Sequence, residues 1–221
     1  MIKPICFLLL ISSVIGFAQL PEGFVYVEEK IPSIKVELRY FSDNNFVGAK
    51  IDGYQREVAI LSEAATMALQ NAQTEFESYG LSIKIFDSYR PQQAVNHFIR
   101  WARDLNDTIN KSRFYPNVEK RFLFKEEYIA TRSGHSRGST LDITLVDINS
   151  CEELDMGSPY DFFGEESWVS HSEITVQQRA NRMLLQSIMA KHGFRNYAKE
   201  WWHFTLRGEP FPETYFDFKV D

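Results

Sequence analysis

Residues 133–142, SGHSRGSTLD, place a histidine and a carboxylate in one short segment that also holds two glycines. His135 precedes Asp142 by seven residues. Glycine tolerates the tight backbone turns that would bring the imidazole back beside a strand carrying Asp142. A histidine and an aspartate at this spacing are common without any function, so the pair needs support from elsewhere in the chain.

A second cluster supplies that support. Residues 200–203 read EWWH and offer a further carboxylate, Glu200, and a further imidazole, His203. Two histidines and one carboxylate, with a fourth position left for water, form a common catalytic zinc site, and a nearby glutamate that is not a ligand can act as general base. By itself EWWH also fits a core aromatic strand with a solvated glutamate. Together the two clusters predict one zinc ion per chain.

The other reactive side chains have simpler interpretations. His97 lies on a predicted helix, His171 in a polar loop and His192 at a predicted helix end, which favours structural or exposed positions. Cys151 has no base near it in the sequence, so we interpret it as a spectator thiol rather than a nucleophile.

Hydrophobic periodicity predicts the elements that must position these groups. Apolar side chains from about Tyr54 to Tyr79 follow the spacing of one helical face, and Gly80 suits the helix end. Residues 81–86 predict a strand, and Pro91 suits the first turn of a following helix, because its missing N–H costs little there. The junction between them would present a side chain to a cleft. The buried face of the following helix is expected to include Ala94, Val95, Phe98 and Trp101.

Residues 140–146 are rich in β-branched and apolar side chains and predict a buried strand interrupted by Asp142. A buried carboxylate is costly as a free ion, and a metal or a proton would relieve that cost. Residues 175–192 predict a third helix that ends at Gly193, and residues 201–206 predict a last strand. The apolar face of the third helix is expected to consist of Val176, Ala180, Met183, Leu184 and Ile188. Helices and strands that do not alternate as parallel-sheet units indicate the α+β class.

The composition is that of a globular chain. The 221 residues, of which 44% are apolar, allow one sizeable core, and no repeat or long linker interrupts residues 19–221, so we expect a single domain there. The 24 basic and 30 acidic residues give a net charge of −6, which argues against binding to nucleic acid.

The first residues are typical of a cleaved secretory signal. Lys3 supplies a positive charge, residues 5–17 are almost entirely apolar, and small residues stand at the two positions that a signal peptidase reads, the second being Ala18. We expect cleavage after Ala18 and a periplasmic or secreted protein without stable membrane insertion, since the apolar stretch is shorter than the roughly 20 residues of a spanning helix. The remaining chain holds one cysteine, which excludes an internal disulfide.

Residues 133–142, the EWWH segment and DSYRP at residues 87–91 together resemble the zinc D,D-peptidases of the VanX type, the D-alanyl-D-alanine dipeptidases. The resemblance covers nearly all of the chain after the leader. It extends to residues 38–40, 45–46, Trp101, 115–117, 155–158, Phe162 and 215–218. It implies a mainly antiparallel central sheet flanked by helices, the fold of the D,D-peptidases and hedgehog proteins, and zinc-dependent hydrolysis of the D-alanyl-D-alanine dipeptide. The leader departs from the better-known members, which work in the cytoplasm.

Carried over by position, the resemblance implies that His135, Asp142 and His203 bind zinc, that Glu200 is the general base and that Arg90 stabilises the transition state. A permanently charged guanidinium suits the negative charge that grows on the oxygen of the attacked carbonyl. Residues three apart point to opposite faces of an ideal strand, so a turn or an irregular strand entry must bring Glu200 beside His203.

The resemblance also suggests how a dipeptide is held. Asp161 matches a position that faces the substrate ammonium, and Ser133 and Tyr40 are candidates for binding the ends of the substrate. Without the resemblance, Asp161 would equally fit an ordinary loop-capping carboxylate.

Two other functions remain open from the sequence. A D,D-carboxypeptidase that trims larger cell-wall peptides would need a cleft that is open at the amino end of the substrate. A zinc-dependent binding protein without turnover is expected when the base or the electrophilic stabiliser has been replaced, and both Glu200 and Arg90 are present.

Overall fold

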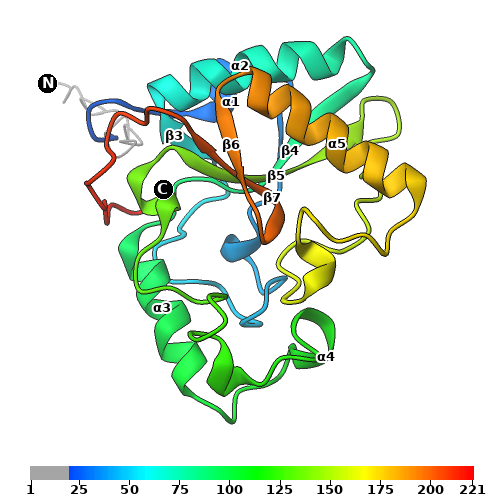
Figure 1. Ribbon diagram of the computed structural model, residues 1–221. Helices are drawn as coiled ribbons and strands as arrows, with labels where there is room; N and C mark the ends of the chain where they lie inside the picture. The colour runs from blue at the N-terminus through cyan, green and yellow to red at the C-terminus, as the bar shows by residue number, and fades with distance from the viewer. Residues whose placement is uncertain (1–19) are drawn as a thin grey trace, which may run out of the picture.

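A five-stranded sheet in the order β2–β4–β5–β7–β6 forms the centre of the computed structural model, which describes residues 20–221 (Figure 1). Its strands are β2 (Lys35–Val36), β4 (Leu81–Asp87), β5 (Thr140–Asp147), β7 (Glu200–Leu206) and β6 (Phe194–Tyr197). All neighbours pair antiparallel except β2, which pairs parallel with β4. The expected α+β class with a mainly antiparallel sheet is therefore confirmed. The predicted signal sequence, residues 1–18, lies outside the described residues.

Helices cover the sheet on both sides. The long helices α2 (Glu63–Glu77) and α5 (Val176–Lys191) lie side by side on one face, and α3 (Gln92–Arg103) lies on the opposite side (Figure 1). The remaining elements are the short helices α1 (Val27–Lys30) and α4 (Lys111–Phe114), the strand pair β1 (Phe24–Tyr26) and β3 (Ile60–Ser62), and four 3-10 turns at residues 39–41, 120–122, 134–137 and 165–167. Among residues 20–221, no helix combines the length and apolarity that crossing a membrane requires.

Most predicted elements form where the periodicity placed them. The three predicted strands are β4, β5 and β7, with ends that differ by one residue. Helix α5 begins after the N-cap Thr175, whose side chain forms a capping box with Gln178, and Gly193 follows its end with a φ of 93°. Pro91, predicted in the first turn of this helix, is instead the N-cap of α3, one residue before the helix begins.

The prediction of one helix from Tyr54 to Tyr79 was wrong at its beginning. Residues 60–62 form β3, which pairs antiparallel with β1, and α2 begins only after Ser62. The Ser62 hydroxyl accepts a hydrogen bond from the N–H of Ala65 and so caps the helix. Pairing with a strand more than 30 residues away overrode the local periodicity, which carries no information about such a partner.

The predicted apolar face of α5 was wrong in part. Ile188 is buried and Leu184 packs on the core as expected, but Val176, Ala180 and Met183 are exposed, and the buried face includes Asn181 and Arg182. The Arg182 guanidinium donates to the carbonyl groups of Met156, Glu166 and Trp168, and Asn181 donates to that of Asp155. Because these bonds satisfy the buried polar atoms, a polar face of the helix packs on the segment that follows β5.

The turn that carries His135 depends on the second glycine of its motif. Gly138 ends this turn with a φ of 80°, and a Cβ atom there would overlap the ring of Phe24 on β1. Another side chain at this position would therefore suffer both backbone strain and a steric clash.

We expect Gly138→Ala to lower the free energy of unfolding by about 3 kcal/mol, since left-handed strain and overpacking add. Gly80→Ala is the matched control, because Gly80 has a φ of 73° but open space around its Cβ position. It should cost only about 1 kcal/mol. Urea unfolding of both variants measures the difference, and equal losses would contradict the steric contribution of Phe24.

Candidate active site

Three potential metal ligands meet at one end of the central sheet. His135 lies in the turn before β5, and Asp142 of β5 pairs directly with His203 of β7. Asp142 Oδ1 lies 3.0 Å from His203 Nδ1 and 3.3 Å from His135 Nε2, and the two imidazole nitrogens are 3.3 Å apart. One donor atom from each residue, all within 4.8 Å of one another, could hold a single metal ion.

The surroundings of these donors fit a divalent metal such as zinc. Asp142 Oδ1 is buried without a hydrogen-bond partner, which is the condition that a coordinated ion relieves. His135 Nδ1 donates to the carbonyl oxygen of Ser88 at 2.7 Å, so its Nε2 lone pair faces the cluster. A second hydrogen bond of this kind is how proteins orient a metal-binding imidazole.

The other oxygen of Asp142 is held from two directions. Asp142 Oδ2 accepts a hydrogen bond from the Tyr160 hydroxyl at 3.1 Å and lies 3.4 Å from Arg90 Nη2. Burial acts to raise the pKa of Asp142, but the imidazoles of His135 and His203 outweigh it and hold that pKa below its usual range. The ionised form of the carboxylate is therefore favoured, and two hydrogen-bond donors orient it.

Arg90 is fixed at the junction between β4 and α3. Its Nε donates to Asp87 Oδ2 at 2.8 Å, and its guanidinium lies 5.0 Å from the centre of the Tyr40 ring. Asp87 is fully buried, and the Tyr54 hydroxyl donates to its other oxygen at 2.6 Å. Burial raises the pKa of the Asp87 carboxyl, although the positive charge of Arg90 opposes the rise.

Glu200 lies beside the cluster, as its proposed role requires. Its Oε2 is 3.3 Å from His203 Nδ1. The expected irregular strand entry is present, since the pairing of β6 with β7 shifts next to Glu200. Burial raises the pKa of Glu200 above its usual range, His203 opposes the rise and Asp142 adds to it. A carboxyl with a raised pKa is better suited to exchanging a proton near neutral pH.

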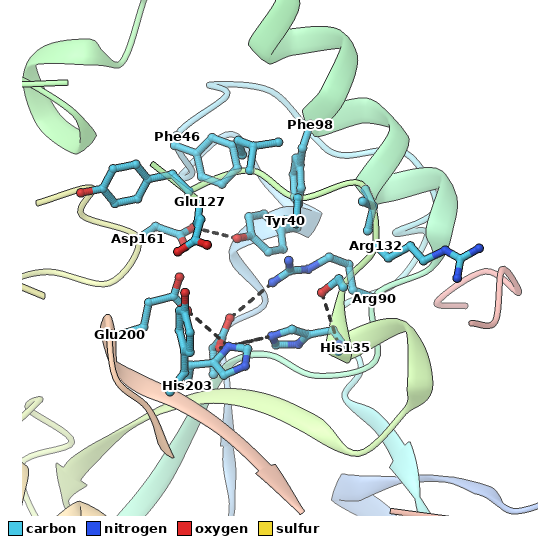
Figure 2. Close-up of a pocket in the computed structure, with 18 of the residues that line it drawn as sticks. Tyr40, Phe46, Arg90, Phe98, Glu127, Arg132, His135, Asp161, Glu200 and His203 are labelled. Atoms are coloured by element: carbon cyan, nitrogen blue, oxygen red, sulfur yellow. Dashed lines mark hydrogen bonds and ion pairs between the residues drawn. The ribbon is translucent and has the colours of Figure 1, made fainter. Parts of the chain in front are cut away.

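One pocket of about 330 Å³ contains all eight side chains that the sequence singled out (Figure 2). They are Tyr40, Arg90, Ser133, His135, Asp142, Asp161, Glu200 and His203. Figure 2 shows Tyr40 and Asp161 on the wall that faces His135 and His203. Phe46, Phe98 and Phe163 supply apolar lining. His97, His171, His192 and Cys151 do not line this pocket, and Cys151 is exposed.

The three predicted substrate-binding residues differ in how they are held. The Tyr40 hydroxyl donates to Asp161 Oδ2 at 2.9 Å, and Asp161 adopts a φ of 59°, which is unusual for a residue other than glycine. Burial raises the pKa of Asp161 well above its usual range, and the nearby Asp142 adds to the rise. The Ser133 hydroxyl accepts a hydrogen bond from the N–H of His135, so it also caps the turn that carries this histidine.

Sequence reasoning missed the residues behind the pocket wall. Asp87 was part of a quoted motif without an assigned role, and Tyr54 and Tyr160 were not singled out. Tyr160 precedes Asp161 and contacts Asp142, so a tyrosine next to a recognised site residue was the only available signal. These contacts join residues far apart in the chain, and periodicity does not report them.

An α+β fold that gathers two histidines, an aspartate, a glutamate and an arginine in one pocket is that of a metallopeptidase. The comparison with known proteins gives the family. The profile described as Peptidase_M15, D-ala-D-ala dipeptidase, matches residues 21–221, and the chain belongs to this family.

Similar proteins include two named D-alanyl-D-alanine dipeptidase. The one from Enterococcus faecalis is 38% identical over 90% of this chain and 98% of its own length. The one from Streptomyces coelicolor is 40% identical over 89% of this chain and 98% of its own length. Among solved structures, a mutant of the vancomycin-resistance D,D-pentapeptidase VanY in complex with Zn(II) aligns at 13% identity with a TM-score of 0.43, over 80% of this chain and 88% of that one.

We expect Tyr160→Phe to weaken zinc affinity by on the order of 10-fold, because it removes the hydrogen bond that orients Asp142. The fold should persist, since only one hydroxyl is lost. Competition with a chromophoric chelator measures the affinity. Tyr128→Phe is the control, because Tyr128 lines the same pocket without a hydrogen bond to the cluster. Equal affinities of Tyr160→Phe and wild type would contradict the orienting role.

Proposed function

We propose that this chain hydrolyses D-alanyl-D-alanine to two D-alanines with one bound zinc ion. The observation that carries the proposal is that one pocket holds three ligand donors, a carboxylate and a guanidinium within reach of each other. Family membership supports it, and the named dipeptidases match over nearly their whole length.

His135, Asp142 and His203 would hold the ion, and zinc bound there supplies a Lewis acid that lowers the pKa of water to about 7. The Glu200 carboxylate accepts the proton of the attacking water and delivers it to the departing amine. Because its pKa is raised, the Glu200 carboxylate accepts a proton from water more readily than an ordinary glutamate and can still release that proton to the amine. Arg90, anchored by Asp87, stabilises the negative charge on the substrate carbonyl oxygen.

The wall opposite the candidate metal ligands would select a dipeptide. Asp161 would pair with the substrate ammonium, and that positive charge would favour the ionised form of this buried carboxyl. Ser133 and Tyr40, which both line the pocket, would bind the ends of the substrate. A volume of about 330 Å³ is at the lower end of ligand pockets, which run from roughly 300 to 1,000 Å³. These features support a small zwitterionic substrate.

A D,D-carboxypeptidase on longer peptides would need an open path beyond Asp161. The ring of Tyr128 stacks on Phe163 at 4.9 Å, and the Lys199 ammonium pairs with Glu127 at 2.6 Å beside the pocket. Tyr128, Phe163 and Glu127 line the pocket, and its small volume favours a free dipeptide. A binding protein without turnover has less support, because Glu200 and Arg90 both line the pocket.

We expect purified, zinc-loaded protein to hydrolyse D-alanyl-D-alanine. It should act on the N-acetylated dipeptide and on L-alanyl-L-alanine less efficiently by on the order of 10²-fold, because these lack the free ammonium or the right stereochemistry. Glu200→Ala is the matched control and should retain zinc while kcat falls by on the order of 10²-fold or more. Equal cleavage of the capped dipeptide would instead indicate a carboxypeptidase, and no turnover would indicate a binding protein.

We further propose that the enzyme acts outside the cytoplasm, because the first 18 residues have the composition of a cleaved secretory signal. An exported enzyme has no access to the cytoplasmic D-alanyl-D-alanine from which cell-wall precursors are made. Its role would then be cell-wall turnover or scavenging of D-alanine rather than vancomycin resistance.

Cell fractionation and N-terminal sequencing should find a processed protein that begins near Gln19 in the periplasmic or secreted fraction. Its expression should leave cytoplasmic D-alanyl-D-alanine and vancomycin susceptibility unchanged. Unprocessed, active enzyme in the cytoplasm together with a smaller dipeptide pool would restore the resistance role.

A further inference from the structure

Glu200 and His203 face the same pocket although they are three residues apart on one strand. On a regular strand their side chains would point to opposite faces of the sheet. Here Glu200 Oε2 lies 3.3 Å from His203 Nδ1. The backbone between them must therefore depart from regular geometry, and something must hold that departure in place.

The departure lies in the pairing of β6 with β7. Asn196 pairs with Phe204, but the next residue of β6, Tyr197, pairs with Glu200. One step along β6 thus corresponds to four along β7, and the three residues 201–203 have no opposite residue on β6. Irregular pairing of this kind leaves main-chain carbonyl groups without their usual donors, and buried carbonyl groups need donors from elsewhere.

The side chain of Asn196 supplies these donors. Its Nδ2 lies 2.7 Å from the carbonyl oxygen of His203 and 3.1 Å from that of Glu200, with the carbonyl of Trp201 at 3.4 Å. The reverse orientation of the amide would set its oxygen against these same carbonyl oxygens, so the donor must face them. One side chain therefore binds the main chain of both Glu200 and His203.

We propose that Asn196 is a positioning residue, whose side-chain amide holds the irregular start of β7 so that the Glu200 carboxylate stays beside His203. Asn196 does not line the pocket and acts through these two residues. The inference rests on the proposed function in one respect, since the role of Glu200 as base connects the geometry to turnover. A displacement of about 1 Å at a catalytic group lowers a rate by on the order of 10²-fold.

Asn196→Leu removes the amide at similar size and without a change in charge. At saturating zinc, kcat for D-alanyl-D-alanine should fall by between about 10-fold and 100-fold, with KM within about 3-fold of wild type. Arg195→Leu is the matched control, because Arg195 is the preceding, exposed residue of β6 and pairs regularly with Thr205. Its kcat should stay within about 2-fold of wild type. An unchanged kcat in Asn196→Leu would overturn the proposal.

A double-mutant cycle separates positioning from a general loss of structure. At saturating zinc, Asn196→Leu added to Glu200→Ala should lower kcat by less than about 2-fold, because the carboxylate that it positions is already absent. The same factor in both backgrounds would overturn the proposal and leave Asn196 a purely structural role. Circular dichroism checks folding, and Asn196→Ser replaces Asn196→Leu in the cycle if the latter does not fold.

Zinc affinity gives a readout that does not depend on turnover. Because Asn196 also binds the carbonyl group of His203, Asn196→Leu should weaken zinc affinity by on the order of 10-fold in chelator competition, and Arg195→Leu should not. Wild-type protein that binds zinc but does not hydrolyse the dipeptide would contradict the proposed function while this comparison still tests the positioning role. Equal zinc affinity in Asn196→Leu and wild type would contradict the positioning of His203.

Discussion

The buried negative charge of Asp142 is the constraint around which this molecule is arranged. Its side chain is almost inaccessible near the start of β5, and removing a carboxylate from water costs several kcal/mol unless partners compensate. The imidazoles of His135 and His203 contact Asp142 Oδ1, and the Tyr160 hydroxyl and the Arg90 guanidinium contact Oδ2. The turn before β5, the neighbouring strand β7, the segment after β5 and the junction between β4 and α3 each contribute one partner. The charge proposed to bind a metal thus also requires these four parts of the fold to meet.

The antiparallel sheet brings the polar groups into one row. Asp142 pairs with Asp87 on β4 and with His203 on β7, so an anchor for Arg90 and two candidate metal ligands lie side by side across three strands. Both irregularities of the sheet occur at this end, one between Ile85 and Asp87 and the other next to Asn196. On regular strands, alternate side chains would lie on the opposite face of the sheet from the pocket. The irregular pairing changes their direction so that they point into one pocket.

The wall that faces the metal ligands depends on a different set of contacts. Asp161 lies in the segment between β5 and α5, and its unusual backbone conformation has to be held by its surroundings. Arg182 binds three carbonyl groups on both sides of this residue, and Tyr40 binds its carboxylate directly. Tyr160 contacts both Asp142 and Tyr40, so it links the metal-binding wall to the wall proposed to bind the ammonium.

The sequence by itself determined the residue types that could do chemistry and the elements with strong local periodicity. His135, Asp142, His203 and Glu200 stand in short segments whose composition already indicates a metal site, and β4, β5, β7 and α5 followed from their side-chain spacing. Only the tertiary structure decided the beginning of α2, the buried face of α5 and the supporting roles of Tyr160 and Asn196. Each depends on a partner from another part of the chain. Strand β1 pairs with residues 60–62, and loop carbonyl groups accept the hydrogen bonds of the Arg182 guanidinium. Periodicity records which side of an element is apolar, but a polar group becomes favourable to bury only where the fold supplies its partner.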